Sequence, residues 1–166
     1  MNVEMESPFV FKIRTILHAT DFSDCSEYAR RVACSLTRDL GARLIVIHVA
    51  PDEIVHAGLI GGPDDVKLHL EELQERLREI FQENLDTHAE VRVREGEPAS
   101  VILQLAEEVH ADLIVMGTMG RSGFGRFLLG SVAEAVMHRA KCPVLTVRCP
   151  IKISSPQTPS MAGAEA

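Results

Sequence analysis

The sequence predicts an α/β fold with a parallel sheet and helices on both of its faces. Apolar stretches of strand length alternate with stretches of helical periodicity along most of the chain. Two of these stretches, "RLIVIHVA" (43–50) and "ADLIVMG" (111–117), are almost entirely apolar, as strands covered on both faces are. With 166 residues, the chain is long enough to form one domain with a sizeable core.

The first half of the chain opens with a strand and a helix. "FKIRTILHA" (11–19) is rich in apolar and β-branched residues and is expected to be the first strand. Ser23 is expected to cap a helix that runs to about Leu40, because Gly41 follows where a helix C-terminus favours glycine. The apolar face of this helix consists of Ala29, Val32, Ala33, Leu36 and Leu40.

Beyond the second strand, residues 51–63 are expected to form a loop. The next helix is expected to extend from Asp64 to about Leu85. "HAEVRVREG" (88–96) alternates and carries many charges, so it predicts a third strand at a sheet edge. Pro98 suits the first turn of the following helix. The apolar stripes of the two helices consist of Val66, Leu70, Leu73, Leu77, Ile80, Phe81 and Leu85, and of Val101, Ile102, Leu105, Ala106 and Val109.

After the fourth strand, a helix is expected to end near Ala140, and "CPVLTVR" (142–148) predicts the fifth strand. The chain is thus divided into an N-terminal extension (1–10), a single domain (11–149) and a C-terminal tail (150–166). The tail is rich in Pro, Ser and Ala and is expected to be disordered.

The composition argues against several classes of protein. The formal net charge of −7 disfavours nucleic acid and anionic membranes as partners, and no apolar run approaches the ~20 residues that span a bilayer. The N-terminus lacks a basic start followed by an apolar core, so we expect no signal peptide and a cytoplasmic location. The four cysteines lack CxxC spacing and are expected to be core or near-surface residues. The seven histidines form no close ligand pair, so no metal site is expected.

Two polar strand ends are expected to meet. In a doubly wound sheet, ligands bind at the carboxyl ends of the strands where the winding direction reverses. If the first and fourth strands flank this reversal, "TDFS" (20–23) and "GTMG" (117–120) lie in one crevice. From Gly117 to Gly130 the chain contains five of its 11 glycines and no acidic residue.

This glycine-dense stretch allows two interpretations. It is not a P-loop, and Leu128 stands where a dinucleotide fingerprint needs its third glycine. Glycines let the backbone approach a ligand, and the following helix N-terminus, with Arg121 and Arg126, would attract phosphate. Alternatively, the glycines only form turns and Ser131 caps the helix, since Ser131 to Glu134 fits a capping box.

The chain resembles the universal stress proteins over about residues 11–148. The resemblance rests on "ILHATDFS" (16–23), "LIVIHVAP" (44–51) and the stretch 111–148. The last contains the ATP-binding pattern of that family, G-x2-G-x9-G-[ST], as Gly117, Gly120, Gly130 and Ser131. The resemblance implies a Rossmann-like three-layer sandwich, similar to adenine nucleotide alpha hydrolases, with five parallel strands in the order 3-2-1-4-5. It also implies a homodimer paired through the last strand (143–148).

The resemblance further implies binding of ATP, with Mg²⁺. The residues that match are Thr20, Asp21, Val49, Met116, Gly117, Gly120, Arg121, Gly130, Ser131 and Val132. It places Asp21 by the adenosine, the backbone of Val49 around the adenine and Met116 in the pocket wall, while the glycines wrap the phosphates. Two residues depart from the pattern: Ala19 stands where many members have proline, and Met119 where many have histidine.

Asp21 allows two interpretations of its own. Its carboxylate can accept hydrogen bonds from the ribose or the adenine amine, and it can help hold Mg²⁺ through water. Alternatively, it caps the next helix alongside Ser23.

The function expected from these features is that of a nucleotide-dependent switch or sensor in the stress response. Phosphoryl transfer needs a positioned base, metal ligands and cationic charge, and no catalytic residue is identified, so hydrolysis is expected to be slow at most. One alternative is an ATPase or autophosphorylating enzyme that uses a loop residue such as Ser122. Another is a ligand-free dimer whose surface and 52–63 loop bind partner proteins.

Overall fold

Five parallel strands form the sheet in the computed structural model, which describes residues 11–50, 63–82, 89–118 and 129–149. The strands are β1 (Thr15–Thr20), β2 (Arg43–Ala50), β3 (Ala89–Glu95), β4 (Leu113–Gly117) and β5 (Val144–Val147). Their order is β3-β2-β1-β4-β5, and each neighbouring pair is parallel. The predicted fold class and strand order are confirmed, as is the place of β3 at a sheet edge.

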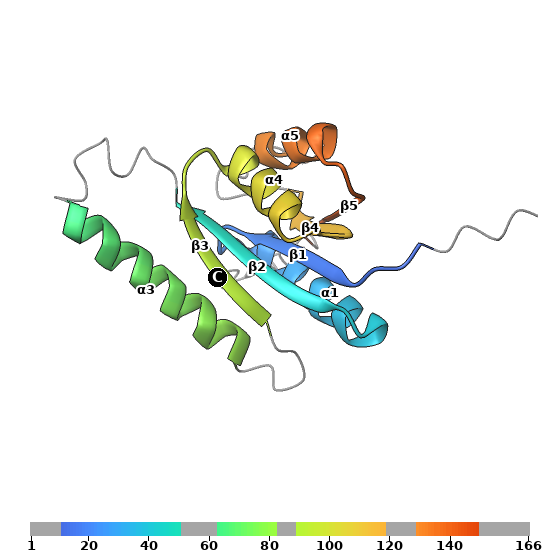
Figure 1. Cartoon of the computed structure of the whole chain (residues 1–166), viewed down its shortest axis with the longest axis horizontal. Helices are drawn as coiled ribbons and strands as arrows, with labels where there is room; N and C mark the ends of the chain where they lie inside the picture. Colours follow the sequence, from blue (N-terminus) through green and yellow to red (C-terminus); the bar gives the residue numbers. More distant parts are fainter. Residues whose placement is uncertain (1–10, 51–62, 83–88, 119–128, 150–166) are drawn as a thin grey trace, which may run out of the picture.

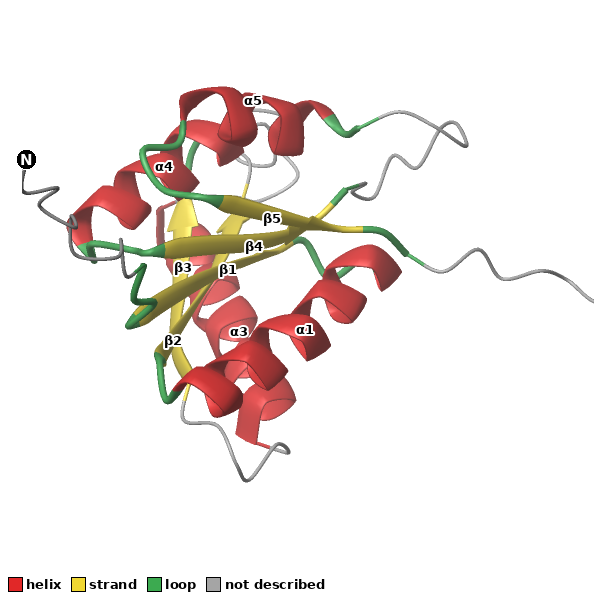
Figure 2. Cartoon of the chain, turned by 90° about the vertical axis from the view of Figure 1, so that its right-hand side faces the viewer, coloured by secondary structure: helices red, strands yellow, loops and turns green. Residues whose placement is uncertain are grey.

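Helices lie on both faces of the sheet (Figures 1 and 2). The described helices are α1 (Asp24–Leu40), α3 (Pro63–Gln82), α4 (Pro98–Glu108) and α5 (Ser131–Arg139). Figure 2 shows α1 and α3 on one face and α4 and α5 on the other. The protein is therefore a three-layer sandwich.

Alternation along the strands supplies a separate core to each face. In β1, Leu17 and Ala19 pack against α4 and α5, whereas Ile16 packs against α1 and α3. Successive strand residues point to opposite faces, so one apolar strand serves both layers. This explains why the central strands are almost continuously apolar.

The start of the first strand and the burial of Leu40 differ from the sequence predictions. β1 begins at Thr15 and not at Phe11, because its ladder with β2 starts at Thr15 and the Asp112 carboxylate binds the preceding backbone. Asp112 Oδ2 accepts hydrogen bonds from Arg14 N at 2.8 Å and from Thr15 N at 2.9 Å. Leu40, predicted on the buried face of its helix, is 49% exposed because it lies at the very end of α1.

Other predictions fall on residues whose structure is not described. These are the N-terminal extension (1–10), the loop 51–62, the part of the 64–85 helix beyond Gln82 and the C-terminal tail (150–166). The predicted C-terminal glycine of the first helix is confirmed: Gly41 adopts the left-handed conformation, with φ of 61°.

Candidate functional site

The sheet changes its winding direction between β1 and β4. From β1 the chain winds to β2 and β3 on one side, whereas β4 and β5 lie on the other. Ala19 pairs with Met116 and Thr20 pairs with His48, so the next residues, at the carboxyl ends of the strands, are brought together at one edge. This edge is where doubly wound folds bind ligands.

The turn that follows β1 is fixed by its own hydrogen bonds. Ser23 caps α1, as predicted, and its Oγ accepts a bond from Ser26 N at 3.2 Å. Asp21 Oδ1 accepts bonds from Ser23 N at 3.1 Å and from Ser23 Oγ at 2.6 Å. Thr20 Oγ1 accepts from Phe22 N at 3.2 Å and donates to Ser26 Oγ at 3.0 Å. The Asp21 carboxylate therefore supports the cap residue and does not itself cap the helix.

Three residues at this edge are not among the site residues that the sequence predicts. His48 Nδ1 donates a hydrogen bond to the carbonyl oxygen of Thr20 at 2.8 Å. Phe22, at φ 63°, places its ring centroid 4.5 Å from that of His48, and the guanidinium of Arg76 lies 4.4 Å from the Phe22 centroid. The signal for His48 was its place as the single polar residue of "LIVIHVA". Arg76 had no signal, because only the fold brings α3 over this turn.

Gly117 ends β4 in close contact with the first turn of α1. A Cβ atom at this position would lie 3.0 Å from the carbonyl carbon of Cys25 and 3.1 Å from its oxygen. The structure therefore gives Gly117 a packing role in addition to the ligand role that the sequence predicts.

The two ends of the glycine-dense stretch are joined at their base. Thr118 N donates a hydrogen bond to Val147 O at 3.0 Å, and Gly130 N donates one to Thr118 O at 2.7 Å. Gly117 and Ser131 are therefore held near each other, although Gly120 and Arg121 lie outside the described residues.

The predicted capping box at Ser131 is wrong. Glu134 N donates to Gly130 O at 2.9 Å, so Gly130 is the N-cap and Ser131 is already the first helical residue. Ser131 cannot then accept the hydrogen bond of an N-cap, and within the described residues no side chain caps α5. Among the described residues, the first amides of α5 thus have no side-chain acceptor, and a helix N-terminus of this kind attracts anions.

Val49 and Met116 lie beneath this edge. Both side chains are buried in the core formed with α4 and α5, and Val132 packs against the same core. Ser131 is exposed beside them. The described residues thus bring eight of the ten predicted site residues to the carboxyl ends of β1, β2 and β4 and to the start of α5. Among the described residues, no group of three or more His, Cys, Asp or Glu side chains could hold a metal ion.

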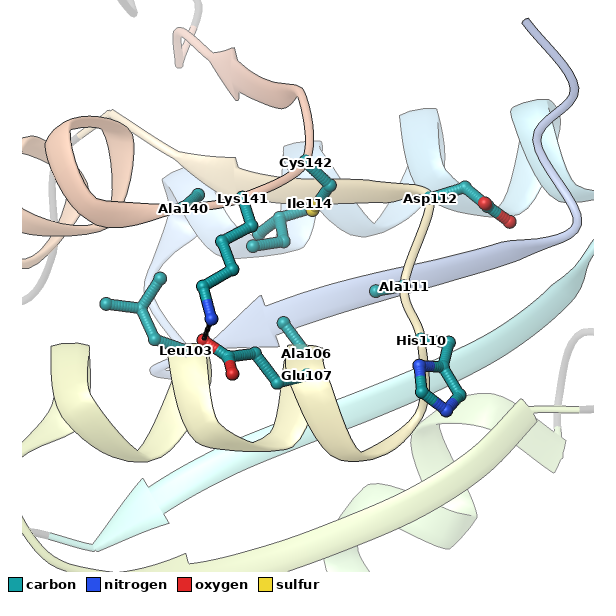
Figure 3. A pocket seen from close by; sticks show the side chains of 10 residues that line it. All are labelled: Leu103, Ala106, Glu107, His110, Ala111, Asp112, Ile114, Ala140, Lys141 and Cys142. Carbon is teal, nitrogen blue, oxygen red and sulfur yellow. Dashed lines mark ion pairs between the residues drawn. The ribbon is translucent and has the colours of Figure 1, made fainter.

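A pocket lies at the opposite end of β4 and β5 from this edge (Figure 3). This pocket, of about 420 Å³, is lined by apolar side chains such as Ala106 and Ile114, by Cys142 and by an ion pair between Lys141 and Glu107 at 2.9 Å. It contains none of the predicted site residues. The pocket lies between α4 and the start of β5. The polar residues that follow β1 and β4 lie at the other end of the sheet.

The strand order defines a doubly wound α/β protein whose winding direction reverses between β1 and β4. The sequence pattern of the universal stress protein family matches residues 12–148, and the chain belongs to this family. A universal stress protein of Methanocaldococcus jannaschii is 37% identical over 147 residues, which cover 84% of each chain.

Solved structures of this family share the fold. A universal stress protein in complex with cAMP has a TM-score of 0.64 and 27% identity, and the match covers 83% of this chain and 99% of that one. The universal stress protein of Archaeoglobus fulgidus in complex with dAMP has a TM-score of 0.54 and 25% identity, with the same coverage of 83% and 99%. In the part of the chain that is described, no helix is both long enough and apolar enough to cross a membrane.

Proposed function

We propose that this protein binds ATP, with Mg²⁺, and acts as a nucleotide-dependent switch or sensor. The observation that carries the proposal is the convergence of Asp21, Gly117 and the uncapped start of α5 at one edge of the sheet. Two structures of the family, in complex with cAMP and with dAMP, support a nucleotide as the class of ligand.

Each part of the edge suits one part of the nucleotide. The carboxylate of Asp21, oriented by Ser23, is a hydrogen-bond acceptor for the ribose hydroxyls. The backbone at Gly117 and Gly130 carries no Cβ, so phosphate oxygens can approach it closely. The first amides of α5, at Ser131 and Val132, then donate to the phosphates along the helix dipole.

The preference for ATP over a mononucleotide rests on the spacing of the glycine-dense stretch. Gly120 and Arg121, which lie outside the described residues, complete the pattern with Gly117 and Gly130. Arg121 adds positive charge to a protein of net charge −7. A triphosphate gains most from such a stretch, since it presents more charge than a monophosphate.

A binding role is favoured over catalysis because Asp21 is the one carboxylate in the proposed set. Two hydrogen bonds from Ser23 occupy its Oδ1 atom, which suits a fixed acceptor better than a group that transfers protons. Phosphoryl transfer also requires a positioned nucleophile and metal ligands. We therefore expect hydrolysis of ATP to be slow at most, so that any release of phosphate takes hours.

The test uses calorimetric titration of the purified full chain with ATP and Mg²⁺, after mass spectrometry of any nucleotide that co-purifies. We expect Asp21→Ala to weaken ATP binding by roughly tenfold to a hundredfold, because a hydrogen bond to a charged group contributes about 1.5–3 kcal/mol. The matched control, Ser23→Ala, removes the cap and keeps the carboxylate. It should lower stability by about 1 kcal/mol and change affinity less than Asp21→Ala does.

Absence of binding heat and of a thermal shift at millimolar ATP would contradict the proposal. Unchanged affinity in Asp21→Ala, with a loss of stability alone, would show that Asp21 serves only the turn.

A further inference from the structure

Two cysteines that are far apart in the sequence meet beside the end of β4. Cys25 lies in the first turn of α1 and is 7% exposed, whereas Cys149 follows the end of β5 and is partly exposed. Both are free thiols. The edge proposed to bind nucleotide makes no use of either sulfur.

The fold itself brings these thiols together. Val147, the last residue of β5, packs in the core on the α1 side of the sheet, whereas Val144 packs toward α4 and α5. Cys149 follows Val147 by two residues, just beyond the end of the strand. Gly117, the register partner of Val147, contacts the backbone of Cys25. Both cysteines are thus placed over the end of β4.

The two thiols interact directly. The side chain and the backbone N–H of Cys149 both act on the ionisation of the Cys25 thiol, so the two residues are close neighbours. Burial, together with the bond to the Cys149 side chain, raises the pKa of Cys25 to about 11. Cys25 is therefore a protonated, shielded thiol at neutral pH, and the more exposed Cys149 is the one that an oxidant reaches first.

We propose that Cys25 and Cys149 are a redox modification site, which closes to an intramolecular disulfide when a hydroperoxide oxidises the protein. The Cys149 sulfur attacks one peroxide oxygen, the O–O bond breaks, and the departing oxygen leaves as water after protonation. The Cys25 sulfur then attacks the sulfenic acid of Cys149. An S–S bond forms, the S–O bond breaks, and the hydroxide takes the Cys25 thiol proton to leave as a second water. The two sulfurs lose two electrons in total, which the peroxide gains.

Closure requires the two sulfur atoms to approach each other. A disulfide needs an S–S distance of about 2.05 Å, shorter than a hydrogen-bonded pair of thiols. Cys149 lies beyond the last residue that β5 pairs with β4, so the sheet ladder does not hold it in place. Cys25 can stay in its helix while Cys149 approaches.

The remaining cysteines do not compete for this bond. Cys34 lies nine residues after Cys25 on α1, about 13 Å along the helix axis. Cys142 lies at the opposite end of the sheet, in the pocket of Figure 3. The pairing of Cys25 with Cys149 is therefore the one expected within a single chain.

The test is peptide mapping of the nucleotide-free full chain after treatment with one equivalent of hydrogen peroxide and alkylation of the remaining thiols. We expect a linked Cys25–Cys149 peptide that lacks two hydrogens and that a dithiol reductant separates again. A variant with Cys34→Ala and Cys142→Ala should form the same link to the same extent. In Cys25→Ser, Cys149 should instead accumulate as a sulfenic acid that dimedone traps.

Two results would overturn the proposal. One is sulfinic acid at Cys149 of the unmodified sequence, with no linked peptide. The other is disulfides only between chains, seen as dimers on a non-reducing gel. Both results are measured on the protein without substitutions. A variant that fails to fold therefore does not affect the conclusion. Neither depends on nucleotide, so the proposal stands or falls separately from ATP binding.

Discussion

At the scale of the residue, Gly117 has a packing role and a proposed ligand role that a motif cannot separate. The glycine pattern assigns it to phosphate binding, whereas its contact with Cys25 shows that the first turn of α1 needs the space that a Cβ would fill. Both roles exclude a side chain. A loss of ATP binding in a Gly117 variant would therefore not by itself identify a ligand residue.

Stability in the absence of nucleotide isolates the packing role. Gly117→Ala should lower the free energy of unfolding by about 1–3 kcal/mol, because the new methyl group presses on the Cys25 backbone. Urea denaturation of the nucleotide-free protein measures this change. The control is Gly41→Asn, where a Cβ atom would meet no other part of the chain within 4 Å and asparagine tolerates φ of 61°. Equal stability of Gly117→Ala and the original sequence would show that α1 shifts without cost.

Residue-level prediction succeeded where a signal is local in sequence. Ser23 was identified as a cap because the residue type and its position before a helix suffice for that inference. The support that Asp21 gives to Ser23, and the contact of Arg76 with Phe22, depend on side-chain geometry and on the packing of α3. No spacing in the sequence encodes these contacts.

At the scale of the element, the two edge strands differ in how they are protected. β3 carries Arg94, which forms an ion pair with Glu108 at 2.6 Å, and a second ion pair between Arg92 and Glu90. β5 is the apolar sequence "VLTV", and its Leu145 is 36% exposed. Charged side chains discourage pairing between sheets, so β5 is the edge better suited to a second copy. We propose that two chains pair through residues 143–148.

Leu145→Lys tests this dimer. The substitution places a charge on the proposed interface, and we expect the dissociation constant to rise by at least about tenfold, equivalent to 1.4 kcal/mol. Light scattering coupled to gel filtration measures the mass over a dilution series. Arg92→Ala, on the opposite edge, is the control and should leave the mass unchanged. A monomeric protein without substitutions would contradict the proposal.

The sequence predicted the type of each described helix and strand correctly, but it placed several of their first and last residues wrongly. The fifth strand was predicted over 142–148, but the regular ladder extends only from Val144 to Val147. The N-cap of α5 was predicted at Ser131 and lies one residue earlier, at Gly130. Apolar periodicity identifies the buried middle of an element, whereas its ends depend on which backbone groups find partners.

At the scale of the whole molecule, a buried histidine links stability to pH. His18 lies in the central strand β1 and is fully buried, with Nδ1 donating to Val115 O at 3.0 Å. Among the described residues, its Nε2 is one of two buried side-chain polar atoms without a hydrogen-bond partner. Burial lowers the pKa of His18 from 6.5 to about 4, and Arg30 also lowers it, while the bond to Val115 opposes the shift.

The pH dependence follows from this lowered pKa. The unfolded chain binds a proton at His18 below pH 6.5, whereas the folded protein does so only near pH 4. Stability should therefore fall as the pH drops through this range, by roughly 3 kcal/mol from this group alone. Urea denaturation at pH 7 and at pH 4.5 measures the loss. His18→Asn, which keeps a donor for Val115, should show a shallower slope, and an unchanged slope would assign the effect to other groups.

The hydrogen bond between Gly130 N and Thr118 O has a consequence for how such proteins diversify. It joins two backbone groups, so any residue except proline at position 130 can make it. Substitutions between these positions can then alter which ligand is preferred without changing where the stretch leaves the sheet and where it enters α5. We expect the positions of β4 and α5 to stay the same when the residues between them are substituted.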